Sequence, residues 1–279
     1  MPDEPLIGPV AAPELQVMTF NIRRRMPRAG RRGPDRWENR APALRQLLQA
    51  ERPTVLGVQE ALPDQTEFVA ESLGSRYSWI GRGRDADGTG EACPVFFDTT
   101  KVRLLEWTQL ALSDTPRVAG SRSWGNHVPR VVVWAVFEPA NGGSQFRFLN
   151  THFDHQSRRA RVRSAELILR LVDSSQGPAL VTGDFNTSVG TSPHQQLTID
   201  GSLRDAWDTA NTRLTKAWGT YPNYHPPKLD RKRIDWILAN RWVDVRAVGI
   251  NTARFDTGLS TDVAASDHLP VQAVVQLQD

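Results

Sequence analysis

The chain has 279 residues, of which 39% are hydrophobic and 23% are charged, and this composition is ordinary for a globular protein with a sizeable core. Lys and Arg total 34 against 31 Asp and Glu, so net charge alone does not indicate nucleic-acid binding. No apolar run reaches the ~18 residues of a membrane span, and the N-terminus lacks the pattern of a secretory signal. The single cysteine, Cys93, excludes an intramolecular disulfide and lies in an apolar run. We therefore expect a buried thiol in a monomeric cytoplasmic protein.

Strands and helices are predicted along the chain after a proline-rich stretch at 1–14, which is expected to be a flexible N-terminal arm. The first part is predicted to hold a strand at 15–22, a helix at 36–50, a strand at 55–58, a helix starting at Pro63, and strands at 92–98, 102–109, 130–138 and 145–151. The second part is predicted to hold a helix at 156–173, a strand at 180–182, an irregular region at 189–230 with a short helix at 193–198, and strands at 234–238, 243–250 and 271–277. Residues 15–279 should form a single α/β domain of two packed sheets covered by helices.

Polar side chains interrupt the apolar pattern at the ends of several predicted strands. Asp184 and Asn186 follow the strand at 180–182, and an extended chain would point both to the same side. Asn21 ends the first strand and Glu60 follows the second. The pattern recurs at His152, Asp235 and the run 266–268. One such residue usually caps a turn, but polar ends of many strands can converge on one rim and form an enzyme site.

These residue types fit one chemistry. Asn21 and Glu60 offer the oxygen ligands that Mg²⁺ or Mn²⁺ prefers. His152 and His268 can donate hydrogen bonds to a phosphate or a developing oxyanion, and Asp184 can orient a water molecule and accept its proton. The set predicts a metal-dependent phosphoester hydrolase, in which catalysis is mostly positioning and charge neutralisation.

Six short motifs occur in a characteristic order. They are Met18–Arg23, Val58–Glu60, Asn150–His155, Thr182–Asn186, Arg233–Ile237 and Ser266–Val271. In this order they resemble the endonuclease/exonuclease/phosphatase superfamily, which includes DNase I-like nucleases, sphingomyelinases and inositol polyphosphate phosphatases. The resemblance covers 15–277 and implies a four-layer α/β sandwich with two mixed sheets flanked by helices.

The resemblance also implies roles around a metal and a water molecule. Glu60 is expected to be the principal metal ligand, with Asn21 supporting the site and Asp267 as a further acid on the metal side. Asp184 is expected to activate the attacking water, and Asn186 to bind phosphate or metal.

Further residues are implied to bind the phosphate. His152 resembles a phosphate-binding histidine, and Glu91 resembles the acid that orients it. His268 resembles a second histidine, which Asp235 should hold through a hydrogen bond. Arg130 resembles the arginine that reaches a substrate phosphate in DNase I-like members.

The substrate stays open between a nucleic acid and a small phosphoester, such as a sugar or lipid phosphate. Apurinic endonucleases carry an acid two residues after the first-strand asparagine, and Arg23 at that position argues against an abasic-site enzyme. The overall pattern is similar to small bacterial metal-dependent hydrolases of the superfamily. A non-catalytic binding module is the third interpretation, and the presence of Glu60, Asp184 and His268 argues against it.

Arginines crowd the loop after the first strand, and guanidinium groups bind phosphate in a fork-like geometry. Arg24, Arg28 and Arg31 are therefore expected to bind substrate anions, with a solvated loop as the alternative. A second arginine cluster at 158–163 fits a solvated helix face equally well.

Several aromatic residues and histidines have two interpretations. The group Trp218, Tyr221, Tyr224 and His225 either forms an aromatic wall for a base or sugar ring or packs a long loop. His155 is expected to be a supporting or loop residue. His127 and His194 are expected at the surface.

Overall fold

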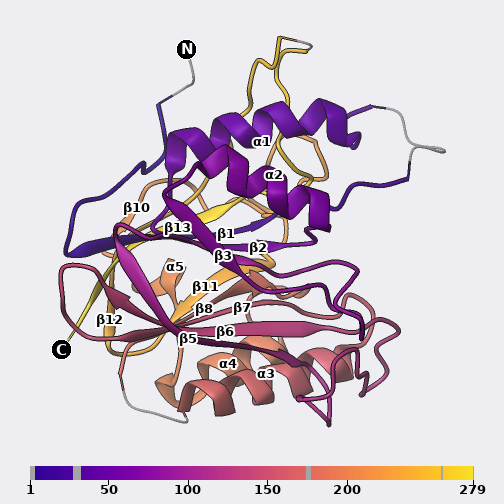
Figure 1. The fold of residues 1–279 in the computed structure, drawn as a ribbon, viewed down its shortest axis with the longest axis vertical. Coiled ribbons are helices and arrows are strands. Elements are labelled where there is room, and N and C mark those ends of the chain that lie inside the picture. Colours follow the sequence, from indigo (N-terminus) through magenta and orange to yellow (C-terminus); the bar gives the residue numbers. More distant parts are fainter. Residues whose placement is uncertain (1–3, 28–32, 174–176, 259, 279) are drawn as a thin grey trace.

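The chain folds into four layers, in which two mixed β-sheets pack face to face between helices (Figure 1). The computed structural model describes residues 4–27, 33–173, 177–258 and 260–278. The expected four-layer α/β sandwich is confirmed. Among the described residues, no helix is long and apolar enough to cross a membrane.

The first sheet is built around β1 (Glu14–Asn21), which runs parallel to β2 (Val55–Gln59) and antiparallel to β13 (Val271–Leu277). Its other strands are β3 (Tyr77–Ile80), β4 (Val95–Asp98), β10 (Thr212–Arg213) and β12 (Val243–Ile250). The order across this seven-stranded sheet is β10-β12-β13-β1-β2-β4-β3. Helices α1 (Trp37–Glu51) and α2 (Pro63–Leu73) cover its outer face (Figure 1).

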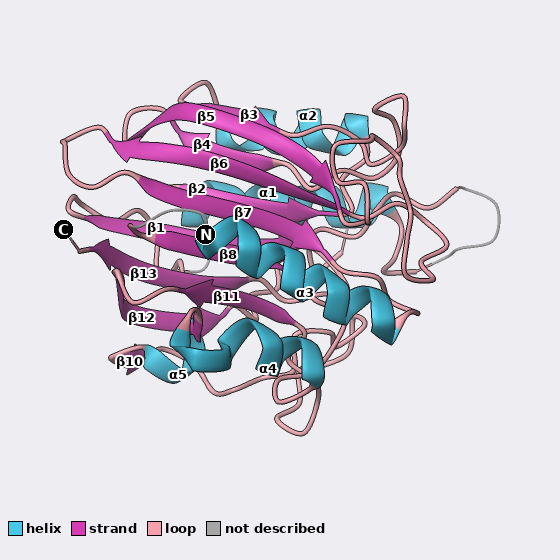
Figure 2. Cartoon of the chain, turned by 90° about the horizontal axis from the view of Figure 1, so that it is seen from below, coloured by secondary structure: helices cyan, strands magenta, loops and turns pink. Residues whose placement is uncertain are grey.

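The second sheet has six strands in the order β5-β6-β7-β8-β11-β9. They are β5 (Val102–Ala111), β6 (Val131–Pro139), β7 (Phe146–His152), β8 (Ala179–Asp184), β11 (Asp235–Ala239) and β9 (Arg204–Asp205). Helices α3 (Arg158–Asp173) and α4 (Ser192–Thr198) lie over its outer face, as Figure 2 shows. A 3₁₀ turn (Ile199–Gly201) and the short α5 (Ala206–Thr209) complete the described helices.

Alternation along the central strands explains the layers. In β1, Val17 faces the other sheet while its neighbour Met18 faces α1 and α2. In β8, Leu180 faces the first sheet while Val181 packs beneath α3. Because adjacent side chains of a strand point to opposite faces, continuous apolar runs become strands that are buried on both sides.

The register of the strands brings their polar ends to one rim. β7 and β8 are parallel and end together at the pair His152 and Asp184. β11 runs antiparallel to β8, so its first residue, Asp235, also pairs with Asp184. In the first sheet, β1 ends at Asn21 beside the end of β2. One edge of the sandwich therefore collects the residues that the sequence placed at strand ends.

Some boundaries differ from the sequence-based prediction. Asp235 opens β11 rather than lying inside a strand, and 266–268 form a loop before β13. β3 was not predicted, because two of its four residues are exposed and it lacks an apolar signal. The region 189–230 also contains β9, α5 and β10, which are too short to show a periodicity.

The segment expected to be a loose arm makes specific contacts where it is described. The backbone N–H groups of Leu6, Ile7 and Gly8 donate to the buried Glu51 carboxylate at 2.7, 3.3 and 3.0 Å. These bonds hold the segment against the end of α1. Cys93 is buried, and burial raises the pKa of its thiol to about 12, so it is a structural rather than a reactive cysteine.

Candidate active site

A cavity of about 540 Å³ opens at the rim where the polar strand ends meet. It is lined by Arg23, Arg24, Glu60, Arg84, Glu91, Val128, Arg130, His152, His155, Asp184, Asn186, Tyr221, Ile234, Asp267 and His268. The sequence-predicted site residues that the structure describes therefore gather in one place, with Asn21 and Asp235 directly behind the wall through their contacts to Asp184 and His268.

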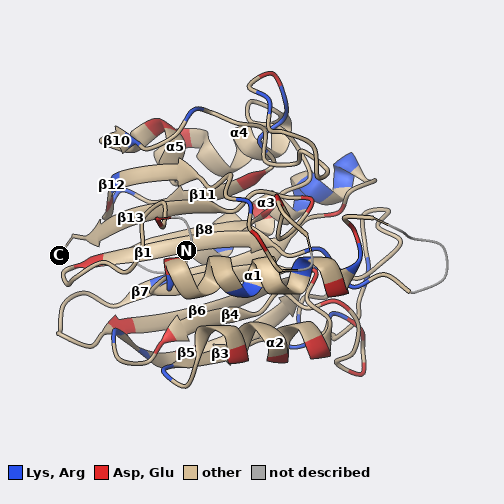
Figure 3. Ribbon diagram, turned by 90° about the horizontal axis from the view of Figure 1, so that it is seen from above, with Lys and Arg blue, Asp and Glu red and all other residues tan. Residues whose placement is uncertain are grey.

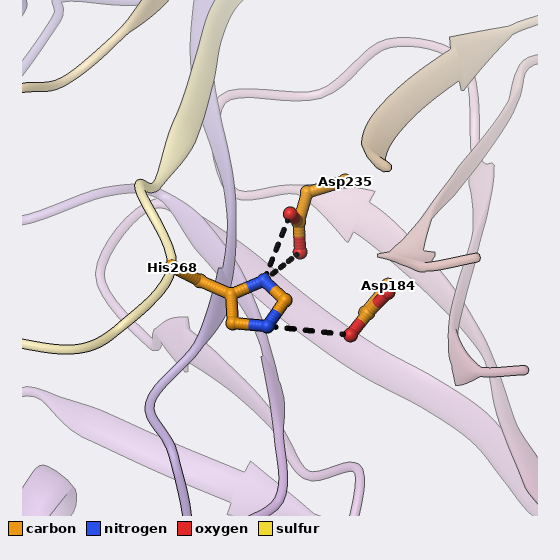
Figure 4. A group of neighbouring side chains, drawn as sticks. All are labelled: Asp184, Asp235 and His268. Carbon is orange, nitrogen blue, oxygen red and sulfur yellow. Dashed lines mark hydrogen bonds and ion pairs between the residues drawn. The ribbon is translucent and has the colours of Figure 1, made fainter. Parts of the chain in front are cut away.

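His268 lies between two carboxylates, as Figure 4 shows. Its Nδ1 is 3.2 and 3.0 Å from the two carboxylate oxygens of Asp235, and its Nε2 is 3.8 Å from Oδ2 of Asp184. Burial disfavours the charged imidazole, but Asp235 and Asp184 outweigh it and raise the pKa of His268 to about 10. His268 is therefore a buried imidazolium near neutral pH.

Asp184 is the second carboxylate next to the charged His268. Burial, with the nearby Asp235 charge, raises the pKa of Asp184 to about 7. Its Oδ2 accepts a hydrogen bond from Asn21 Nδ2 at 3.0 Å, and its Oδ1 accepts one from the backbone N–H of Asn186 at 2.9 Å. A carboxylate with a pKa near the working pH can accept a proton from water, which is the task of a general base.

His152 has the opposite protonation state. Asn186 Nδ2 donates to the backbone carbonyl of Phe153 at 3.0 Å, which fixes the NH₂ end of the amide, and the same nitrogen lies 2.8 Å from His152 Nε2. That ring nitrogen must therefore accept. Burial and the charges of Arg130 and Arg84 hold the pKa of His152 well below its usual value. The Nε2 of His152 also lies 3.5 Å from Oδ2 of Asp184, and the phosphate-binding role of the ring stays a prediction.

Three residues that follow strands adopt a left-handed backbone. Arg23 has φ 56°, Glu60 has φ 64° and Asn186 has φ 50°. Residues other than glycine occupy this region at a cost of about 1–3 kcal/mol, and such strain clusters at functional sites. Asn186 therefore does not continue the extended chain beyond Asp184, and this turn, rather than strand alternation, brings its amide to His152.

Glu60 and Asp267 supply further carboxylates. Glu60 Oε1 accepts from Asn21 Nδ2 at 3.1 Å, and Oε2 accepts from the backbone N–H of Arg24 at 3.0 Å. Burial opposes ionisation of Glu60, but these donors and the charge of His268 lower its pKa. Burial raises the pKa of Asp267.

The donor set fits a hard divalent cation. Carboxylates of Glu60, Asp184 and Asp267 line the same cavity, and such crowded, buried anions favour a bound cation. Asp184, Asp235 and His268 also each present one atom within 4.8 Å of the others, but the charged His268 has no free lone pair on Nδ1. We therefore favour Glu60 and its neighbours, rather than the group that contains His268, as the ligands of a cation. The Oδ1 of Asn21 accepts from the backbone N–H of Arg23 at 2.9 Å and its NH₂ group orients the carboxylates of Glu60 and Asp184, so its supporting role at a metal site stays a prediction.

Arg130 is a buried cation with unused donors. Its Nη2 contacts His155 Nδ1 at 3.0 Å, and its Nε is 3.7 Å from the Asp154 carboxylate. The Nε and Nη1 groups have no hydrogen-bond partner among the residues that the structure describes. A buried guanidinium that lines a cavity with unpaired N–H groups fits an anionic ligand. His155 is thus a partner of Arg130, in line with the supporting role considered for it.

Glu91 does not orient His152 as the resemblance implied. It forms a two-pronged ion pair with Arg84, at 2.7 and 3.1 Å, and lies 3.4 Å from Nε of Arg24. Arg84 is only 15% exposed and lines the cavity, yet it was not predicted. Arg84 lies in the glycine-rich stretch 81–90, which contains no recognisable motif, so the sequence gives no signal for its role.

The three arginines that were predicted to bind substrate anions have different outcomes. Arg24 lines the cavity, whereas Arg28 and Arg31 lie outside the described residues. Figure 3 shows basic residues on the first turns of α3. Of these, Arg158, Arg159 and Arg163 are exposed, and Arg161 Nη1 donates to the backbone carbonyl of Asp154 at 2.8 Å.

The loop before β11 contributes to the site through two residues. The Tyr221 ring packs on the His268 ring with centroids 4.8 Å apart. Thr220, which was not predicted, is fully buried, and its Oγ1 accepts from the backbone N–H groups of Ile234 and Asp235 at 2.9 and 3.1 Å. Of the two interpretations of the aromatic group, an aromatic wall is possible only at Tyr221, since Tyr224 donates to Asp35, Trp218 packs on the core and His225 is exposed.

The predicted surface position of His194 was wrong. The residue is instead buried, 3.3 Å from Asp205 Oδ2 and edge-on to Trp236. Its position on the inner side of α4 depends on a helix too short for a clear amphipathic pattern. His127 is exposed, as expected.

With this geometry in view, the chain can be compared with known proteins. Residues 18–268 match the Endonuclease/Exonuclease/phosphatase family. The chain belongs to this family. A family protein of known structure from Bacteroides vulgatus is 30% identical, with a TM-score of 0.86, over 95% of this chain and 99% of that one. The Bacteroides thetaiotaomicron mannosyl-6-phosphatase Bt3783 is 30% identical, with a TM-score of 0.85, over 94% and 99%.

A further relative is an uncharacterized protein, L388, of Acanthamoeba polyphaga mimivirus. It is 28% identical over 172 residues, which span 54% of this chain and 60% of the viral protein. The match over residues 18–268 shows the family, and one solved relative that is 30% identical is a mannosyl-6-phosphatase.

Proposed function

We propose that the protein is a phosphoester hydrolase that works with a divalent cation, Mg²⁺ or Mn²⁺. The observation that carries the proposal is the charge arrangement of one cavity. Two carboxylates that suit a cation (Glu60 and Asp267), a carboxylate base with a pKa of about 7 (Asp184), a charged imidazole and a buried arginine with unused donors all line the same space. Such a set neutralises a phosphate on several sides while a water molecule is activated next to it.

The protein residues divide the work as follows. Asp184 accepts the proton of a water molecule that attacks phosphorus in line with the leaving oxygen. Arg130 and the charged His268 stabilise the negative charge on the phosphoryl oxygens, and Asn186 holds the His152 ring at the edge of the cavity through its amide nitrogen. Glu60 and Asp267 would hold the cation, which supplies positive charge to the phosphate and the leaving oxygen.

The reaction can be tested on four substrates with and without metal. We would measure hydrolysis of single-stranded DNA, plasmid DNA, bis-p-nitrophenyl phosphate and p-nitrophenyl phosphate with Mg²⁺, Mn²⁺ or excess EDTA. Mannose 6-phosphate is a fifth substrate, because a relative that is 30% identical is a mannosyl-6-phosphatase. Cleavage of the DNA substrates indicates a nuclease, and cleavage of monoesters alone indicates a small-molecule phosphatase.

The metal requirement has a matched pair of variants. Glu60→Gln keeps the size of the side chain and removes the charge that holds a hard cation, so we expect activity to fall by ~10²-fold or more and Mn²⁺ binding to weaken. Glu71→Gln, on the exposed face of α2, removes the same charge away from the cavity and should match the wild type. Equal activity with EDTA and with Mg²⁺ would rule out the metal-dependent mechanism.

A further inference from the structure

Arg23 places a permanent positive charge among the carboxylates of the proposed metal site. Its Nε is 3.2 Å from Oδ1 of Asp35 and 3.5 Å from Oδ2 of Asp267, and its Nη1 is 3.7 Å from Oε2 of Glu60. Its side chain is 20% exposed and lines the cavity. The two carboxylates that suit a cation are thus already next to a cation of the protein itself.

The backbone fixes this arrangement. Arg23 follows Asn21 at the end of β1, takes a left-handed conformation with φ 56°, and donates its N–H to Oδ1 of Asn21. The turn directs the side chain back over the rim instead of out to solvent. A guanidinium group stays protonated at any working pH, so its charge cannot be removed by titration as that of a lysine could.

We propose that Arg23 is a resident counter-cation of the metal site, which pairs with Glu60 and Asp267 when no metal is bound and weakens divalent-cation binding through its own charge. This inference rests on the proposed metal-dependent function. It assigns to Arg23 the role of setting the affinity of the site for its cation through charge.

The physical basis is repulsion between like charges at short range. A divalent ion on Glu60 or Asp267 would lie within several ångströms of the guanidinium group, where repulsion is strong because a partly buried site screens it poorly. The competing explanation is that Arg23 is purely structural and only holds Asp35 in place through their ion pair. The two explanations predict opposite effects on metal affinity when the charge is removed.

The test measures Mn²⁺ binding to the purified full-length chain by titration calorimetry, without substrate. Arg23→Gln removes the charge, and Arg23→Lys keeps it. Arg25→Gln is the matched control, because Arg25 lies in the same segment but pairs with Asp64 at 2.9 Å and does not line the cavity. We expect Arg23→Gln to bind Mn²⁺ about tenfold or more tightly than the wild type, with Arg23→Lys and Arg25→Gln within about threefold of it.

Thermal unfolding gives a second readout that does not depend on activity. Arg23→Gln should have a lower Tm than the wild type without metal, because Glu60 and Asp267 lose their partner, and it should show a larger rise in Tm when Mn²⁺ is added. Unchanged or weaker Mn²⁺ binding by Arg23→Gln would overturn the inference and favour the purely structural role. If the wild type itself binds no Mn²⁺, the proposed metal-dependent function fails together with it. Activity that needs metal, combined with an unaltered affinity in Arg23→Gln, removes the inference alone.

Discussion

Two histidines of the same cavity are held in opposite charge states, and their neighbours account for the difference. His268 lies between Asp235 and Asp184, and its pKa is raised to about 10. The pKa of His152 is lowered by burial and then by the charges of Arg130 and Arg84, although Oδ2 of Asp184 lies 3.5 Å from its Nε2. Both rings are buried, so burial alone cannot explain the contrast. The charged partner decides the state, and only His268 can stabilise negative charge on a phosphate as a cation.

The Asp235–His268 pair leads to a prediction about pH dependence. Asp235→Asn removes the largest interaction that raises the pKa of His268, so this pKa should fall towards the usual value near ~6.5. Because activity requires the charged ring, the basic limb of the pH–rate profile should move to lower pH, and turnover should fall by ~10²- to 10⁴-fold. Mn²⁺ affinity should stay close to that of the wild type. Weakened Mn²⁺ binding together with an unmoved basic limb would show that Asp235 acts on the metal instead.

Sequence reasoning at this scale identified most of the residues that meet but not all of their partners. The Asp235–His268 hydrogen bond was expected, since each residue stood out as polar beside an apolar strand, and the contact is present. The partners of Glu91 were not foreseeable, because they depend on the path of a glycine-rich loop that brings Arg84 back to it. The acceptor role of His152 depends on the left-handed turn at Asn186. Residue type shows which chemistry is available, while loop geometry determines which side chains become hydrogen-bond or ion-pair partners.

At the scale of elements, a buried charge cluster joins α4, β9, α5 and β11. Asp205 accepts from Arg233 at 3.2 and 2.8 Å, from the backbone N–H of Trp207 at 2.9 Å, and lies 3.3 Å from His194 Nε2. Burial opposes its ionisation, but His194 and Arg233 outweigh burial and lower its pKa. These contacts hold the chain at Arg233, two residues before Asp235, where β11 begins.

Asp205→Asn should destabilise the fold by ~3–5 kcal/mol, because Arg233, whose side chain is only 10% exposed, is left without its counter-charge. Urea unfolding at pH 7 measures the loss. The folded-state pKa of Asp205 is lowered, so its contribution is present above the unfolded-state value of ~3.9 and is lost as pH falls through the folded-state pKa. The gap between variant and wild type should therefore shrink below about pH 4. Asp208→Asn, at an exposed position of α5, is the control and should change stability by less than ~0.5 kcal/mol.

The long elements of the fold were predictable and the short ones were not. Strands such as β1 and β8 carry apolar residues on both faces, and α3 has one apolar stripe, so local pattern alone indicates them. β9 and β10 have two residues each, and they exist because neighbouring strands offer them hydrogen-bond partners. Tertiary pairing, not local preference, defines such elements.

At the scale of the whole molecule, the site is shared between the two sheets. Asp184 and Asp235 belong to the six-stranded sheet, whereas Asn21, Glu60 and His268 come from the seven-stranded sheet or the loops next to it. The catalytic arrangement therefore depends on how the sheets are held together at this rim. The apolar core between the sheets fixes their packing, but a specific polar link is needed to align carboxylate and imidazole to within hydrogen-bond distance.

Thr220 provides such a link beside the Asp235–His268 pair, in addition to the Asn21–Asp184 hydrogen bond, and its replacement tests the whole-molecule view. Its hydroxyl accepts from Ile234 and Asp235 in the six-stranded sheet, and its backbone carbonyl accepts from the N–H of Leu269 at 2.8 Å, next to His268. Thr220→Val keeps the shape but leaves two buried N–H groups without an acceptor, so stability should fall by ~1–3 kcal/mol. Asp235 should lose its alignment with His268, which lowers turnover and moves the basic limb of the pH–rate profile to lower pH.

Thr220→Ser is the control for this prediction, since it restores the oxygen acceptor and should recover both the pH profile and most of the turnover. A merely structural threonine would behave differently, because destabilisation without a local misalignment lowers the amount of folded protein and leaves the pH profile of the folded fraction unchanged. A valine variant that is less stable but titrates like the wild type would therefore show that the two sheets align Asp235 and His268 without Thr220. A shifted limb that serine restores would place the alignment of the catalytic pair in one hydroxyl group between the sheets.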